Sequence, residues 1–261
     1  MNRIKANGIE INYRLEGPAD APVLMLSNSL LTDYGMWDLQ VPAFTARYRL
    51  LRYDSRGHGD TQSTPGPYSM SMLVADAIGL VDALGIRKLH FLGLSKGGMI
   101  AQLLAARHGE RLLSVTLCDT ACQMPPASVW DDRIKLAQSK GTSAFMQPMT
   151  DRWLTQGYRE RNPEVVAKLG AMIARTSVDG LVGSACAIRD MDHLPILQGI
   201  KIPTLIVVGE QDVGTPVAAA EVLRREIGQS KLVVIEGAAH MPNIEQTGIF
   251  NTTVLDFIDS H

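Results

Sequence analysis

The sequence predicts an α/β fold with a mostly parallel sheet flanked by helices and a helical cap inserted after the sixth strand. Short apolar runs rich in β-branched residues alternate with segments of helical periodicity, and this alternation is typical of βαβ units. A long stretch between two later strand segments holds helical patterns but no convincing strand. We therefore expect a core of residues 1–121 and 196–261 and a helical cap of residues 122–195.

The elements of the core follow in order along the chain. Residues 9–14 alternate apolar and polar side chains with period two, which indicates a half-buried edge strand. Residues 69–84 carry apolar side chains at helical spacing, and Gly85 follows as a stop signal. The other strand segments are short apolar runs at residues 23–27, 48–53, 88–92, 113–118, 204–208 and 232–235. Ligands bind at the carboxyl edge of open α/β sheets, so a cap over that edge is placed to wall a pocket.

The composition is that of an ordinary globular chain and excludes several classes of partner. The 261 residues are 46% apolar and carry a net charge of −2, so neither nucleic acid nor a membrane surface is an expected partner. No window has the length and apolarity of a transmembrane helix, and the first residues lack a signal-peptide pattern. Cys118, Cys122 and Cys186 form neither a disulfide framework nor a metal-ligand pattern. A cytoplasmic protein without a metal site is therefore expected.

Residues 93–97 read Gly-Leu-Ser-Lys-Gly, a G-x-S-x-G pentapeptide between a strand segment and an apolar helical segment. This context is that of a nucleophile elbow, a sharp turn that lifts the serine hydroxyl above the edge of a sheet. Glycines on either side of Ser95 allow the strand and the helix to approach closely. The helix N-terminus also directs its dipole toward an anion formed there. Ser95 is therefore the candidate nucleophile.

The general base and its acid partner are expected on later loops. A serine hydroxyl needs a base to take its proton, and the base needs an acid that orients it. Asp212 and His240 follow the last two strand segments, in the order serine, acid, histidine that accompanies this type of elbow. We therefore predict a triad of Ser95, Asp212 and His240. Glu210 lies nearer to its strand and stays open as an alternative acid.

An oxyanion hole requires two backbone N–H groups that face the reacting carbonyl oxygen. One is predicted to be the N–H of Lys96, the residue after the nucleophile. The other is predicted to be the N–H of Leu30, in the loop after residues 23–27, with Asn28 and Ser29 bracing that loop through side-chain hydrogen bonds. An ordinary polar turn is the alternative for this loop.

The glycine-rich residues 54–59 also follow a strand segment. They lack the lysine and hydroxyl pattern of a phosphate-binding loop. We therefore predict a tight structural turn in which Arg56 bonds nearby carbonyl groups or a carboxylate.

Four of these segments together resemble the α/β-hydrolase superfamily, at residues 54–59, 93–98, 209–212 and 237–240. Further segments are similar to those of 3-oxoadipate enol-lactonases, at residues 26–30, 51–59, 105–108, 117–121 and 152–155. The resemblance spans nearly the whole chain. It implies Ser95, Asp212 and His240 as the triad and a small anionic lactone as the substrate.

Two positions depart from the pattern of these lactonases. Leu31 stands where they usually carry glycine, and Lys96 stands where they usually carry methionine. The backbone N–H of Lys96 is unaffected by the exchange. Its side chain is expected to reach solvent, to pair with a carboxylate or to meet an anionic substrate.

Side chains of the predicted cap are candidates for substrate contacts. Arg133 and Arg152 suit a carboxylate on the substrate, and Trp130 and Trp153 suit an apolar wall, although plain cap packing also explains the tryptophans. Ser29 is the candidate contact from the core. Four cap methionines are further candidates for the wall, namely Met146, Met149, Met172 and Met191.

These residues predict acyl transfer to water through a Ser95 acyl-enzyme, without a metal or an organic cofactor. The expected substrate is a small ester or lactone, and the resemblance favours an anionic enol-lactone such as 3-oxoadipate enol-lactone. The same triad serves carboxylesterases, perhydrolases and carbon–carbon bond hydrolases, and some related folds act as ligand receptors. These alternatives stay open, as does the oligomeric state.

Overall fold

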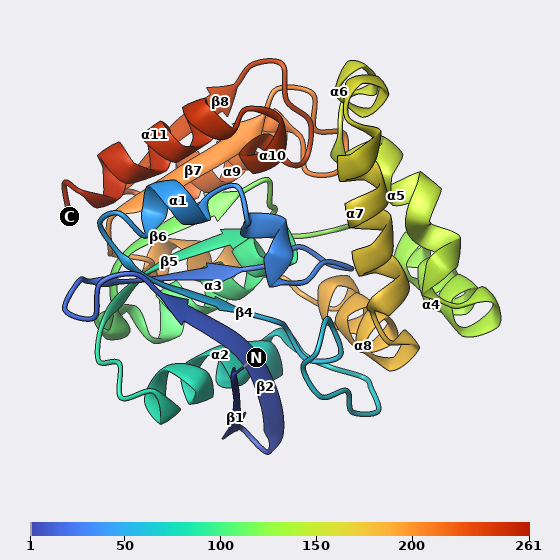
Figure 1. The fold of residues 1–261 in the computed structure, drawn as a ribbon, viewed down its shortest axis with the longest axis horizontal. Helices are drawn as coiled ribbons and strands as arrows, with labels where there is room; N and C mark the ends of the chain where they lie inside the picture. The colour runs from blue at the N-terminus through green and yellow to red at the C-terminus, as the bar shows by residue number, and fades with distance from the viewer. Residues whose placement is uncertain (1) are drawn as a thin grey trace.

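The computed structural model describes residues 2–261, and its centre is a single eight-stranded sheet (Figure 1). The strands are β1 (Asn2–Ala6), β2 (Ile9–Glu16), β3 (Val23–Ser27), β4 (Arg49–Tyr53), β5 (Leu89–Leu94), β6 (Leu112–Cys118), β7 (Thr204–Gly209) and β8 (Ser230–Ile235). Their order in the sheet is β1-β2-β4-β3-β5-β6-β7-β8. The pairs β1–β2 and β2–β4 are antiparallel, and every pair from β4 to β8 is parallel. The predicted mostly parallel sheet is therefore confirmed.

β1 is a strand that the apolar pattern did not predict. Its alternation of polar and apolar side chains covers only residues 3–6, and most of the strand is exposed, so the pattern is too short to predict a strand by itself. The strand forms because Asn7 and Gly8 take positive φ angles of 44° and 78° and close a tight hairpin that places Ala6 opposite Ile9. An Asn-Gly pair directly before an alternating strand is the signal that could have predicted it.

Helices cover both faces of the sheet (Figure 1). On one face, α2 (Met70–Ala83) packs on α3 (Lys96–Arg107), and α3 packs on β5 and β6. On the same face, α9 (Val217–Glu226) packs on β7 and β8. On the other face, α1 (Val41–Phe44) packs on α11 (Thr247–Ile258). The sheet is thus buried between two helical layers, which explains the continuous apolar runs of its central strands.

The chain between β6 and β7 forms a group of helices at one end of the sheet (Figure 1). These helices are α4 (Ala127–Lys140), α5 (Met146–Trp153), α6 (Gln156–Arg161), α7 (Pro163–Arg175) and α8 (Val178–Arg189). α4 packs along α8, and α5 packs along α7. The two ends of the insertion lie together because Gln123 and Asp192 form an isolated β-bridge. A helical insertion after the sixth strand is therefore present, as the sequence predicts.

The cap is fixed to the core through the turn that follows β4. Ser177, the N-cap residue of α8, donates both its N–H and its hydroxyl to the carbonyl oxygen of Gly57, each at 3.0 Å. The two backbones are so close that a Cβ at Gly180 would lie 2.3 Å from the same oxygen. This contact fixes α8 over the carboxyl edge of the sheet.

Short segments complete the chain, namely η1 (Tyr34–Trp37), η2 (Gly109–Arg111), η3 (Thr142–Phe145), η4 (Leu194–Gly199) and α10 (Pro242–Glu245). Within residues 2–261, no helix is both long enough and apolar enough to cross a membrane. The carboxyl ends of β3 and β5 to β8 meet at one edge of the sheet because these strands are parallel. The loops that leave this edge lie beneath the cap and form the candidate site.

Candidate active site

Ser95 lies in the turn between β5 and α3, with a φ of 56° and a ψ of −114°. A positive φ is uncommon for a residue with a side chain and strains the backbone. Glycines make the turn sterically feasible, because a Cβ at Gly93 would lie 2.1 Å from the carbonyl oxygen of Gly97. A Cβ at Gly97 would in turn lie 2.1 Å from the carbonyl oxygen of Ser27. The local sequence therefore forms the predicted elbow, with Ser95 at the N-terminus of α3.

Asp212 and His240 meet on the loops that follow β7 and β8. His240 Nδ1 lies 2.7 Å from Asp212 Oδ2. Asp212 also accepts the Gly214 N–H on Oδ1 at 2.7 Å and the Thr215 hydroxyl on Oδ2 at 2.7 Å. Burial alone would raise the pKa of Asp212, but the charge and hydrogen bond of His240, with the donors of Thr215 and Gly214, lower it to about 2. Asp212 is therefore an ionised carboxylate that orients the His240 ring.

Glu210, the alternative acid, does not contact His240. It is exposed, and its Oε2 accepts the N–H of Gly237 at 3.2 Å. The geometry therefore favours Asp212 as the partner of the histidine.

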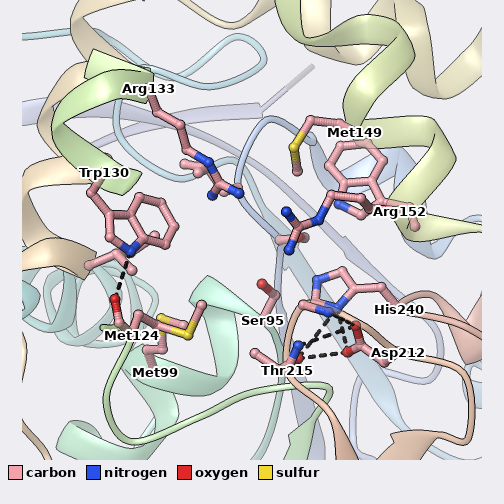
Figure 2. Close-up of a pocket in the computed structure, with 15 residues that line it drawn as sticks. Ser95, Met99, Met124, Trp130, Arg133, Met149, Arg152, Asp212, Thr215 and His240 are labelled. Carbon is pink, nitrogen blue, oxygen red and sulfur yellow. Dashed lines mark hydrogen bonds and ion pairs between the residues drawn. The ribbon is translucent and has the colours of Figure 1, made fainter. Parts of the chain in front are cut away.

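Ser95, Asp212 and His240 line one cavity beneath the cap (Figure 2). Within residues 2–261, no hydrogen bond joins the Ser95 hydroxyl to the His240 ring. Such contacts commonly tighten when a substrate binds. The cavity thus holds a hydroxyl, an imidazole and a carboxylate in the order that general-base activation of a serine needs.

The loop after β3 brings Ser29 and Leu30 to the same cavity. Asn28 braces this loop, because its Nδ2 donates to the carbonyl oxygen of Tyr53 at 2.7 Å. Its Oδ1 accepts from Trp37 Nε1 at 2.9 Å. The Leu30 N–H has no acceptor within residues 2–261, so it is free to donate to a ligand.

Ser29 braces the loop through its backbone, not through the side chain as expected. Its N–H donates to Met36 Sδ at 3.4 Å, and its carbonyl oxygen accepts from the Thr32 hydroxyl at 3.0 Å. Leu31 takes a φ of 67°, a conformation that glycine adopts with less strain. The leucine therefore occupies the left-handed position for which the resembling lactonases use glycine.

The Lys96 side chain is fully buried, and its position corrects the three expectations for it. Its exposed fraction is 0%, and its Nζ lies 3.3 Å from His58 Nε2. The side chain therefore does not reach solvent, its hydrogen-bond partner is an imidazole instead of a carboxylate, and it does not line the cavity. Helical side chains lean toward the helix N-terminus, which directs this first residue of α3 toward the turn after β4. Burial lowers the pKa of Lys96 to about 7, against the opposing effect of the Asp54 charge.

The turn of residues 54–59 is structural, as the sequence predicts. Arg56 donates from Nη2 and Nε to both oxygens of the buried Asp76, at 2.5 and 2.9 Å. His58 Nδ1 lies 3.0 Å from the carbonyl oxygen of Arg56, which leaves Nε2 to accept from Lys96. Burial, reinforced by the Lys96 charge, holds the pKa of His58 well below its usual range, so the ring is neutral.

Two arginines of the cap line the cavity without an acidic partner (Figure 2). Arg133 belongs to α4 and Arg152 to α5, and neither forms an ion pair within residues 2–261. Arg133 instead lies over the Trp130 ring, 4.5 Å from its centroid. Burial, and then the charge of Arg152, lower the pKa of Arg133 to about 10, so Arg133 stays cationic at neutral pH. Two unpaired guanidinium groups suit a carboxylate on a ligand.

The remaining wall of the cavity is mostly apolar. Trp130 and Trp153 line it, and among the four cap methionines Met149 does so. Met146, Met172 and Met191 lie outside the cavity lining. The sequence did not separate them from Met149, since helical periodicity does not show which surface a side chain faces. Sequence reasoning missed five lining residues, namely Met99, Met124, Ile188, Gly214 and Thr215. Met99 lies one helical turn after Ser95, and this spacing could have predicted it.

Known proteins share this fold and much of this sequence. Residues 22–247 match the family described as the alpha/beta hydrolase fold. Over 251 residues, the chain is 38% identical to 3-oxoadipate enol-lactonase 2 of Acinetobacter baylyi, covering 96% of this chain and 94% of that protein. The chain belongs to the α/β-hydrolase fold family.

Solved structures of α/β-hydrolases agree with this assignment. The enol-lactonase from Burkholderia xenovorans LB400 superposes with a TM-score of 0.97 at 38% identity, covering 99% of this chain and 100% of that one. A thermophilic esterase from Thermogutta terrifontis, described with malate bound, has a TM-score of 0.93 at 27% identity and covers 100% of this chain and 99% of that one. The fold and these relatives make this α/β-hydrolase an ester-hydrolysing enzyme.

Proposed function

We propose that this α/β-hydrolase opens a small enol-lactone that carries a carboxylate, such as 3-oxoadipate enol-lactone, through an acyl-enzyme on Ser95. One observation carries the proposal: the cavity that holds Ser95 and the Asp212–His240 pair also holds the unpaired Arg133 and Arg152. The names of two relatives, 3-oxoadipate enol-lactonase and enol-lactonase, support the same substrate class.

Acylation begins when His240 takes the proton of the Ser95 hydroxyl. The serine oxygen bonds to the lactone carbonyl carbon, and the carbonyl electrons move to its oxygen. The ring C–O bond then breaks as this oxyanion collapses, and the leaving enol oxygen takes the proton from His240. The charge of Asp212, 2.7 Å from His240, stabilises the imidazolium between these two transfers.

Deacylation repeats these steps with water. His240 takes a proton from a water molecule, and the resulting hydroxide attacks the acyl carbon of the Ser95 ester. Collapse of the second oxyanion returns the proton to the Ser95 oxygen. The product is an open-chain acid whose enol converts to a ketone.

The oxyanion is held by the Leu30 and Lys96 N–H groups in this proposal. Leu30 lines the cavity, and Lys96 begins α3 directly after the nucleophile. Each donor of this kind contributes about 2.7–4 kcal/mol to transition-state stabilisation. The positive end of the α3 dipole adds to the same effect.

The substrate carboxylate is bound by Arg133 and Arg152. Both side chains extend from the cap toward the space above Ser95 (Figure 2). A carboxylate bound there would pair with two guanidinium groups that form no ion pair within residues 2–261. The anchor holds the lactone ring between the cap and the elbow.

Hydrolysis of 3-oxoadipate enol-lactone by the wild-type enzyme and by Ser95→Ala tests this function. We expect many turnovers per wild-type active site and a loss of at least about 10³-fold in kcat for the variant. Circular dichroism of both proteins checks that the fold is retained. Undiminished lactone hydrolysis by folded Ser95→Ala would contradict the proposal.

A substrate panel separates the alternatives. A preference for neutral aryl esters over the enol-lactone would indicate a carboxylesterase or a perhydrolase. Turnover of a vinylogous diketone would indicate a carbon–carbon bond hydrolase. A single turnover followed by a stable complex would indicate a ligand receptor.

A further inference from the structure

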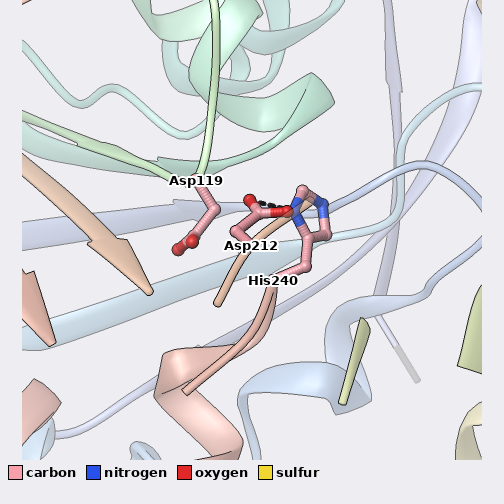
Figure 3. A group of neighbouring side chains, drawn as sticks. All are labelled: Asp119, Asp212 and His240. Carbon is pink, nitrogen blue, oxygen red and sulfur yellow. Dashed lines mark hydrogen bonds and ion pairs between the residues drawn. The ribbon is translucent and has the colours of Figure 1, made fainter. Parts of the chain in front are cut away.

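A second buried carboxyl group lies beside the Asp212–His240 pair. Asp119 directly follows β6, is 1% exposed and takes a positive φ of 43°. Figure 3 shows Asp212 between Asp119 and His240. One carboxylate oxygen of each aspartate and one ring nitrogen of His240 all lie within 4.8 Å of one another. Asp119 is therefore close enough to act on the pair, although the mechanism above does not use it.

The two oxygens of Asp119 have unequal surroundings. Oδ1 accepts the N–H of Gly209, the last residue of β7, at 2.8 Å. Oδ2 is buried and has no hydrogen-bond partner within residues 2–261. A buried carboxylate oxygen without a donor is unfavourable, whereas a protonated oxygen becomes a donor to the Asp212 carboxylate.

Charge places the proton on Asp119 and not on Asp212. Two buried carboxyl groups at this distance do not both ionise. Asp212 has the partners that keep it ionised, His240 above all. Burial, and then the charge of Asp212, hold the pKa of Asp119 well above its usual range, and the charge of Glu245 acts in the same direction.

We propose that Asp119 is a positioning residue that holds a proton against Asp212 and becomes the acid partner of His240 when the Asp212 carboxylate is removed. This inference rests on the proposed function, because it assumes that His240 is the general base. In the wild-type enzyme, Asp119 and Asp212 share one negative charge, which balances the single positive charge that His240 gains from Ser95. Without the Asp212 carboxylate, Asp119 releases its proton to solvent and supplies that charge itself.

A purely structural role for Asp119 makes a different prediction. Asp119 fixes the end of β7 through the Gly209 N–H, and Asp119→Asn keeps that acceptor and nearly the same volume. The amide that this substitution introduces also supplies an N–H to Asp212, but it cannot ionise. The asparagine variant therefore removes the proposed reserve acid while it keeps the structural hydrogen bond.

The test compares four proteins on the enol-lactone and on 4-nitrophenyl acetate, namely the wild type, Asp119→Asn, Asp212→Ala and the double variant. We expect kcat of Asp119→Asn within about threefold of wild type, because Asp212 still orients His240. Asp212→Ala opens space for Asp119 and is expected to lower kcat by about 10²-fold, with activity that rises with pH as Asp119 loses its proton. The double variant is expected to lose a further tenfold or more in kcat, with KM unchanged.

Equal kcat values and equal pH profiles for Asp212→Ala and the double variant would overturn the inference. Asp212→Ser, alone and with Asp119→Asn, repeats the comparison if the alanine variants do not fold. Ser95→Ala separates the two proposals. Activity that survives Ser95→Ala refutes the proposed function. If Ser95→Ala is inactive but Asp119→Asn changes kcat neither in the wild-type protein nor in Asp212→Ala, only the role of Asp119 is refuted.

Discussion

Lys96 Nζ lies 3.3 Å from His58 Nε2 in a fully buried contact, although the backbone of Lys96 directly follows the candidate nucleophile. The N–H of this residue is thus placed for the oxyanion, while its side chain points away from the cavity and toward the turn that anchors the cap. Through His58 and the adjacent Gly57, that turn contacts Ser177 of α8. The elbow and the cap are therefore joined through the buried Lys96 and His58 and the half-buried Ser177.

Lys96→Met is expected to stabilise the protein at neutral pH. Burial of the lysine lowers its pKa from 10.5 to about 7, and a shift of this size corresponds to a penalty on the order of 4 kcal/mol at pH 7. Loss of the hydrogen bond to His58 offsets part of this gain at about 1–3 kcal/mol. We expect a net gain of about 2 kcal/mol in the free energy of unfolding, measured by urea denaturation, and nearly unchanged kcat.

The difference in stability between Lys96→Met and the wild type should decrease as the pH rises. Below pH 7 the lysine is protonated in both the folded and the unfolded chain, so its penalty is constant. Between about pH 7 and 10.5 the unfolded chain holds a proton that the folded chain has released, so wild-type stability gains with pH relative to Lys96→Met. A difference in the free energy of unfolding between Lys96→Met and the wild type that stays constant from pH 7 to 10 would contradict a lowered pKa of Lys96. A variant that is less stable than the wild type at pH 7 would contradict it as well.

Arg152→Gln and Arg133→Gln are expected to weaken binding of an anionic substrate and not of a neutral one. A charge-assisted hydrogen bond contributes about 1.5–3 kcal/mol, so KM for the enol-lactone should rise about 10- to 100-fold. KM for 4-nitrophenyl acetate should change little. Arg161→Gln is the matched control, because Arg161 is an exposed cap arginine outside the cavity lining. Equal losses on both substrates would assign these arginines to cap stability instead.

Gly97→Ala is expected to disrupt the elbow. The new Cβ would lie 2.1 Å from the carbonyl oxygen of Ser27, a backbone atom that cannot move without distorting β3. A loss of about 3 kcal/mol or more in the free energy of unfolding should follow. Gly248→Ala in α11 is the control, because its Cβ would meet nothing within 4 Å and should leave stability equal or slightly higher. The melting temperatures of both variants test this expectation. A Gly97→Ala protein that melts at the same temperature as Gly248→Ala would refute the steric clash with Ser27.

Local sequence patterns predicted the strands β2 to β8 and the proximity of Asp212 and His240. Both residues follow buried parallel strands, so the topology brings them to one edge whatever their exact loops. β1 was not predicted because its alternation of polar and apolar side chains covers only residues 3–6. Asp119 follows the end of β6 much as Asp212 follows β7, so its position at a strand end is a sequence signal that could have predicted its place beside Asp212.

Side-chain direction was the part that sequence alone did not determine. Lys96 and Arg152 are both cationic residues near the predicted pocket, yet the first is buried against His58 and the second lines the cavity. Their directions depend on where the first turn of α3 and the last turn of α5 lie relative to the sheet. Such tertiary geometry leaves no local signal in charge or periodicity.

The acyl-enzyme on Ser95 can be observed by rapid mixing with 3-oxoadipate enol-lactone, an acid quench within milliseconds, and mass spectrometry of the intact protein and of its peptides. Opening of a lactone loses no leaving group, so the acyl-enzyme should carry the mass of the whole substrate. We expect this adduct on the peptide that contains Ser95 in the wild-type protein, and no adduct in Ser95→Ala. Turnover of the lactone without any adduct, together with undiminished turnover by Ser95→Ala, would contradict this expectation.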